Sequence, residues 1–266
     1  MEPSDIEAEL REAGALIVDP RLMRRVILTD RGILGLSLRV PHSHCYGIGR
    51  EALLRIVAAD EIDAEAESLP EEVVLLERPP PSRAARRNPQ LVRERLLRHL
   101  FHARVHLELE RLVLDGALTA ARIRERIERI GRNEFDEVSA ILRHDGLLLP
   151  PHDDRQHYIE FVALYLELRH FAPALLAPTF PSLESPEQVD QVIALDLEVE
   201  ALKQRLYEVD QALSGNRSLQ DMGEARSPTI SGRLRTASAS NGRSDYGPTA
   251  MHRRAFEIAS QEFAEL

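Results

Sequence analysis

Glycine residues divide the middle of the chain into segments that each have the pattern of one helix. Apolar residues recur at helical spacing from Pro89 onward, and Asp115-Gly116, Gly131 and Asp145-Gly146 interrupt the pattern. Because glycine readily adopts the left-handed conformation that ends a helix, each interruption indicates a helix C-terminus. The sequence therefore predicts helices over about 89–114, 119–130, 134–144 and 154–171, within a helical domain over residues 89–183.

The first 78 residues have a mixed pattern of helix and strand. A capping box formed by Ser4 and Glu7 begins the first amphipathic segment. Segments rich in β-branched and aliphatic residues lie on both sides of Asp30-Arg31-Gly32 and predict a hairpin. The elements expected in this small α+β unit are the N-terminal helix, a hairpin of strands 26–29 and 33–40, a loop over 41–49, a helix over 50–62 and a strand over 73–76.

A proline-rich and basic segment separates these two parts. Pro79-Pro80-Pro81 is followed by several arginines between Arg83 and Arg87. Consecutive prolines continue neither a helix nor a strand ladder, so residues 79–88 are predicted to be a linker. The expected fold class is α+β, mainly α, with a hairpin-plus-helix unit, a helical bundle, a long amphipathic helix and a disordered tail.

The long amphipathic helix is predicted over residues 185–214. Ser185-Pro186 supplies a capping residue and a first-turn proline, and Gly215 follows the last apolar position. Apolar residues alternate at gaps of three and four, which is the heptad pattern of a coiled coil. These seam residues are Val192, Leu195, Val199, Leu202, Leu206, Val209 and Leu213. The pattern predicts self-association, although a helix packed on its own bundle would have the same pattern.

The end of the chain has a different composition. Residues 215–250 are rich in Ser, Gly and Arg and poor in large apolar side chains, which predicts a disordered tail. The spacing of Phe256, Ile258 and Phe263 is compatible with an amphipathic terminal helix over residues 251–266.

Charge and composition exclude several classes of function. The net charge of −10 argues against a surface that binds nucleic acid or an anionic membrane throughout. The single cysteine, Cys45, excludes an intrachain disulfide framework and a multi-cysteine zinc site. We find neither an apolar signal segment nor an apolar window of about 18 residues, so a cytoplasmic protein without a membrane partner is expected.

A stripe of histidines in the longest predicted helix has the spacing of metal ligands. His99, His102 and His106 fall within one arc of the helix, and Glu110 joins it. Glu167 and His170, in the helix over 154–171, form one Glu-x-x-His motif, although a di-iron bundle requires two. These six residues are the candidate ligands for Zn, Fe or Mn. The alternative is that the histidines line a semi-polar groove between helices, and no cofactor is then expected.

Two further segments carry features of functional sites. The loop 41–49 places His42 and His44 beside Cys45, which suggests an activated thiol, but a free cysteine is more often a small buried apolar residue. Residues 119–149 have the outline of a winged helix and carry several arginines. Acidic residues alternate with these arginines, so a solvated, ion-paired helix pair is the better interpretation.

These observations favour an interaction or scaffold protein that forms a homodimer, or binds a protein partner, through residues 192–213. The first alternative is a metal-dependent enzyme with a His/Glu site between helices. The second is a nucleic-acid-binding protein that uses the segment 119–149, which the acidic charge disfavours. No catalytic residue is assigned by sequence.

Overall fold

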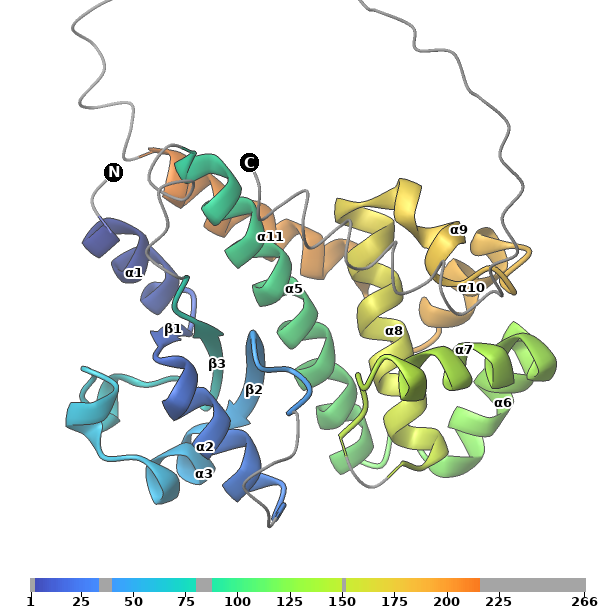
Figure 1. Ribbon diagram of the computed structural model, residues 1–266, viewed down its shortest axis with the longest axis horizontal. Helices are drawn as coiled ribbons and strands as arrows, with labels where there is room; N and C mark the ends of the chain where they lie inside the picture. The colour runs from blue at the N-terminus through green and yellow to red at the C-terminus, as the bar shows by residue number, and fades with distance from the viewer. Residues whose placement is uncertain (1–2, 34–39, 80–87, 150–151, 216–266) are drawn as a thin grey trace, which may run out of the picture.

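The computed structural model describes residues 3–33, 40–79, 88–149 and 152–215 of the chain (Figure 1). Helices predominate and one small sheet accompanies them, so the predicted α+β, mainly α, class is confirmed. Several predicted segments lie wholly or mostly outside the described residues. These are the strand 33–40, the linker 79–88, the tail after Gly215 and the terminal helix 251–266.

The sheet has three strands in the order β1-β3-β2. Strand β1 (Ala15–Val18) pairs in parallel with β3 (Glu72–Glu77), and β2 (Cys45–Gly49) pairs antiparallel with the other side of β3. Because strand side chains alternate between faces, the sheet separates two apolar cores. Val74 and Leu76 join one core, whereas Val73 and Leu75 join the other.

The N-terminal helices confirm part of the sequence analysis and correct another part. Helix α1 (Pro3–Glu12) matches the predicted first helix, and α3 (Arg50–Ile56) is a shorter form of the helix expected over 50–62. Residues 26–29, predicted as a strand, instead lie in helix α2 (Pro20–Asp30). Asp19 caps α2 by accepting a hydrogen bond from the Arg21 backbone N–H at 2.8 Å, and Pro20 begins the helix. These start signals and burial of one apolar face outweigh the β-propensity of the segment.

Helix α5 (Pro89–Leu114) has the predicted bounds and packs between the sheet and the remaining helices (Figure 1). The segment 41–49, expected as a loop, ends in strand β2, which α5 crosses closely. Gly47 makes this approach feasible, because a Cβ atom there would lie 2.5 Å from Cγ of Leu107. Gly47 thus serves helix-to-sheet packing here.

The helical half of the molecule surrounds α8 (Asp154–Phe171), which is buried along most of its length. Helices α6 (Ala120–Ile130) and α7 (Arg132–His144) pack against α8, and the short α9 (Leu176–Thr179) follows it. Thr119 caps α6 and Asp153 caps α8, through hydrogen bonds to the backbone N–H three residues later. Single-turn 3-10 helices at Ala59–Glu61, Ala66–Ser68 and Pro173–Leu175 complete the fold.

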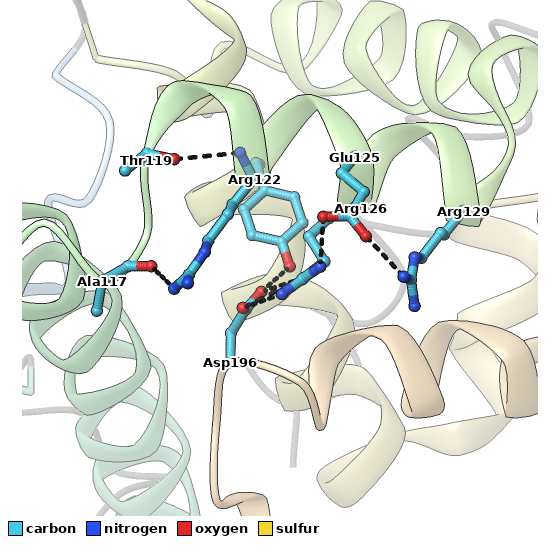
Figure 2. A network of polar contacts seen from close by, with 8 residues as sticks. Ala117, Thr119, Arg122, Glu125, Arg126, Arg129 and Asp196 are labelled. Atoms are coloured by element: carbon cyan, nitrogen blue, oxygen red, sulfur yellow. Dashed lines mark hydrogen bonds and ion pairs between the residues drawn. The ribbon is translucent and has the colours of Figure 1, made fainter.

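The helix predicted over residues 185–214 is divided into α10 (Pro186–Ile193) and α11 (Val199–Gly215). Asp196 lies in the interruption and binds Arg126 of α6, with Oδ1 3.0 Å from Nη2 and Oδ2 3.1 Å from Nε (Figure 2). Tyr158 donates a further hydrogen bond to Asp196 at 2.9 Å. This buried paired carboxylate offsets the hydrogen bonds lost where the helix breaks, and such a tertiary interaction is not visible in a heptad pattern.

The heptad seam is largely covered by the chain itself. Leu202, Leu206 and Leu213 are buried where α11 packs on α5 and α1, whereas Leu195 is 51 % exposed. Asp210 of α11 accepts a hydrogen bond from Nε of Arg93 in α5 at 2.8 Å. Self-association through residues 192–213 therefore stays a prediction. Among the described residues, no helix is long and apolar enough to span a bilayer.

Candidate metal centre

Three histidines surround one buried glutamate where the sheet edge, α5 and α8 meet. Nε2 of His42 lies 2.8 Å from Oε2 of Glu160, and Nε2 of His106 lies 3.1 Å from the same oxygen. Nε2 of His102 lies 3.9 Å from the other carboxylate oxygen. One ligand atom from each of the four residues falls within 4.8 Å of every other. The cluster therefore has the composition and the size of a metal site.

The local backbone explains how these side chains meet. His102 and His106 are four residues apart in α5, so they occupy adjacent turns on one face. Glu160 lies in the buried middle of α8, which packs along α5. His42 precedes β2 and has a φ of 59°, a left-handed conformation that is costly for a residue with a Cβ. The chain thus accepts backbone strain at the residue that completes the cluster.

The contacts within the cluster are close but are not ordinary hydrogen bonds. Oε2 of Glu160 and Nε2 of His106 are both buried and have no hydrogen-bond partner among the described residues, although the two atoms are 3.1 Å apart. Buried polar atoms in proteins are normally satisfied. A cation between the side chains would satisfy these atoms together.

Burial and proximity set the charge of the cluster. Burial alone raises the pKa of Glu160, but the neighbouring imidazoles of His42 and His106 outweigh it and hold the pKa well below its usual value. Burial lowers the pKa of His106 to about 4, so its imidazole is neutral at pH 7. Burial lowers the pKa of His102, but its interactions with Glu167 and Glu160 outweigh burial and raise it, which favours the protonated imidazole. A carboxylate and a neutral imidazole are the forms that bind metal ions, so binding at His102 would displace this proton.

A second carboxylate orients His102. Oε2 of Glu167 lies 2.7 Å from Nδ1 of His102, which leaves Nε2 facing the cluster. Glu167 lies seven residues, or about two turns, further along α8 than Glu160 and also accepts a hydrogen bond from Arg98. Burial raises the pKa of Glu167, but the bond to His102 and the charge of Arg98 lower it to about 2. Carboxylate partners of this kind fix the tautomer of metal-binding histidines.

A small cavity of about 20 Å³ adjoins the cluster. His42, His102 and His106 contribute to its wall, together with Gln156 from the first turn of α8. Gln156 is buried, and its Nε2 has no hydrogen-bond partner among the described residues. The rest of the wall is formed by Arg31, Cys45, Tyr46, Gly47, Ala103, Glu110 and Leu149.

The structure brings together only part of the ligand set predicted from sequence. His102 and His106 belong to the cluster, and Glu167 is adjacent to it as the partner of His102. His99 faces elsewhere and stacks on His44, with ring centroids 5.4 Å apart. Glu110 pairs with Arg31 at 2.8 Å and contributes only to the cavity wall. His170 is exposed and contacts Phe101 and Phe171 rather than the cluster.

Sequence reasoning missed His42 and Glu160 as ligands. His42 lies in the His/Cys-rich segment before β2, a pattern that suggests an activated thiol at Cys45 rather than a metal ligand at His42. The signal for Glu160 was that it shares a face of α8 with Glu167. Neither spacing identifies a ligand, because these residues approach α5 only in the tertiary structure.

The candidate thiol site at Cys45 and the candidate nucleic-acid-binding segment 119–149 lie in environments that disfavour those functions. Cys45 is buried, and desolvation together with Glu167 raises its pKa, which disfavours the nucleophilic thiolate. In the segment 119–149, Arg126 binds Asp196 and Arg129 pairs with Glu125 at 2.6 Å (Figure 2). Arg132 pairs with Asp136, and residues 147–149 form no strand. These guanidinium groups are engaged within the chain.

Comparison with known proteins gives no relative for this arrangement: no family model, curated protein or solved structure matches the chain.

Proposed function

We propose that the protein binds one divalent first-row transition-metal ion through His42, His102, His106 and Glu160. The observation that carries the proposal is the convergence of three imidazole Nε2 atoms on one buried carboxylate, at 2.8, 3.1 and 3.9 Å. The ligand set comes from three separate parts of the chain, which is unlike an accidental repeat along one helix.

The spacing of the donor atoms suits a metal of this class. Zinc binds imidazole nitrogen and carboxylate oxygen at about 2.0–2.2 Å, which separates neighbouring ligand atoms in a tetrahedron by roughly 3.3 Å. The observed separations from Glu160 bracket this value. Small rotations of the side chains would be enough to centre an ion.

Charge balance supports the same conclusion. With neutral histidines, a divalent ion would offset the charge of Glu160, because Arg98 already offsets the charge of Glu167. Without an ion, burial of these groups is compensated only by protonated imidazoles and Arg98. Zn, Fe and Mn all accept imidazole and carboxylate ligands. Cys45 lines the cavity, but its raised pKa disfavours a thiolate ligand.

Metal analysis of the full chain, purified without a histidine tag, tests the proposal. We expect one Zn, Fe or Mn per chain, or stoichiometric uptake of Zn by the metal-free protein. His42→Asn and Glu160→Gln should each weaken Zn binding at least about 100-fold, because loss of a ligand exceeds the roughly 10- to 100-fold effect of losing a ligand's partner. Asparagine tolerates the left-handed backbone at position 42, so the first variant separates ligand loss from strain.

Two matched substitutions control for histidine loss in general. His144 is exposed at the end of α7, and His99 faces His44, so His144→Gln and His99→Gln should leave Zn binding unchanged. Failure of the folded wild-type chain to bind Zn, Fe or Mn would show that the four residues form a purely structural ion-pair cluster. Equal losses in all four variants would instead indicate nonspecific binding.

The metal centre supports only the binding part of the metal-enzyme hypothesis, and no reaction is assigned to it. Dimerisation through residues 192–213 has less support, because the chain covers most of the seam with α5 and α1.

A further inference from the structure

We infer that the metal keeps one coordination position for a small non-protein ligand, and that Gln156 donates a hydrogen bond to that ligand. This inference rests on the proposed metal site and adds its ligand class. The class comprises water, hydroxide and small anions that present a single oxygen or nitrogen donor atom.

The cavity supplies the space. It measures about 20 Å³, which is room for one ordered water molecule, and its wall includes His42, His102 and His106. Glu160 does not line the cavity, whereas the three histidines of the cluster do. A ligand in the cavity therefore approaches the ion beside the histidines without displacing Glu160.

Gln156 supplies the donor. It is 6 % exposed, and its Nε2 lacks a hydrogen-bond partner among the described residues, although it lines the cavity. Its position is fixed by the cap of α8, where its backbone N–H donates to Asp153 at 2.9 Å. Gln156 lies four residues before Glu160 on the same face of α8, so the orphan amide and the ligand carboxylate point toward the same region. A buried amide donor without a partner is unfavourable, and a metal-bound oxygen or nitrogen would satisfy it.

An ion pair in the wall and the small size of the cavity limit which ligands enter. Arg31 and Glu110 form an ion pair of 2.8 Å there and are both partly exposed, whereas the other polar groups of the cavity are more deeply buried. Arg31 also donates a hydrogen bond to Tyr46. A ligand must fit a water-sized space, which excludes bulky substrates from direct contact with the ion.

Titration of the Co²⁺-loaded full chain with azide tests the inference through the visible absorption of the metal. We expect a saturable spectral change as azide enters the open position. Gln156→Leu, which keeps the side-chain size and removes the donor, should weaken azide binding at least about tenfold, as expected for a hydrogen bond to a charged ligand. Its Co²⁺ affinity should stay within about threefold of wild type, since Gln156 is not placed among the ligands.

Gln204→Leu is the matched control, because Gln204 is exposed on α11 and its side chain donates a hydrogen bond to Glu208. It should leave both Co²⁺ and azide binding unchanged. If azide does not change the spectrum of the Co²⁺-loaded wild type, the metal site is closed and structural. If wild type and Gln156→Leu bind azide with equal affinity, Gln156 does not donate to the ligand. Co²⁺ binding is measured before azide is added. If the wild-type chain does not bind Co²⁺, the proposed function itself is overturned.

Discussion

At the scale of single residues, the chemistry of the site depends on which carboxylate meets which imidazole. Glu160 and Glu167 lie on one face of α8, and both are buried. Glu160 faces the Nε2 edges of the histidines, whereas Glu167 contacts Nδ1 of His102 and the guanidinium of Arg98. Two similar residues thus have different roles: one completes the ligand set and the other orients a ligand.

Glu167→Gln tests that division. The amide keeps the size of the side chain and weakens its interaction with Nδ1 of His102, so Zn affinity should fall by about 10- to 100-fold while the stoichiometry is retained. Competition with a chromophoric chelator measures the change. Glu110→Gln is the control, because Glu110 pairs with Arg31 and should affect Zn affinity by less than about threefold. Equal effects of the two substitutions would contradict the assigned roles.

At the scale of elements, local signals explain the helix ends, and packing explains the rest. Helices α6, α7 and α8 lie close to their predicted bounds. Thr119 caps the start of α6, Asp153 caps the start of α8, and glycines follow α6 and α7. Residues 26–29 have strand-like side chains but continue α2, because Asp19 caps that helix and its apolar face is buried. The heptad helix breaks at Asp196, where Arg126 and Tyr158 bind the carboxylate. Periodicity cannot anticipate a partner that is distant in the sequence.

The crossing of α5 over β2 gives a prediction about stability. Gly47→Ala places a Cβ atom 2.5 Å from Cγ of Leu107, so the helix or the strand must shift. We expect a loss of about 1–3 kcal/mol in the free energy of unfolding, which is typical of an overpacked core. Gly49→Ala is the control, since the nearest atom to its Cβ would be 4.0 Å away. Urea unfolding of both variants measures the difference, and equal stabilities would contradict the close packing.

At the scale of the whole molecule, the candidate metal centre joins segments that are remote in sequence. His42 belongs to the sheet-containing part, and Glu160 belongs to the helical part that follows the predicted linker. Helix α5 carries the remaining two ligands between them (Figure 1). A bound ion would therefore restrain the contact between both parts.

This arrangement predicts that metal stabilises the whole chain. Free Zn at about 100 times its dissociation constant should raise the free energy of unfolding by roughly 2.7 kcal/mol and increase the Tm accordingly. Thermal unfolding of metal-free protein with and without Zn measures the effect. Glu160→Gln should show little increase under the same conditions, and His144→Gln should respond as wild type does. A Tm that Zn leaves unchanged in wild type would argue against the site.

The sequence by itself determined the features that depend on neighbouring residues: the helices from 89 to 171, the strand at 73–76, and the placement of His102 and His106 on one face of α5. Helix caps, glycines and side-chain periodicity act over a few residues, so the elements that depend on them can be predicted from the sequence. Only the tertiary structure placed His42 and Glu160 beside that face, turned His99 toward His44 and covered the heptad seam. Those outcomes depend on packing between elements far apart in sequence, where burial and ion pairing compete with local preference.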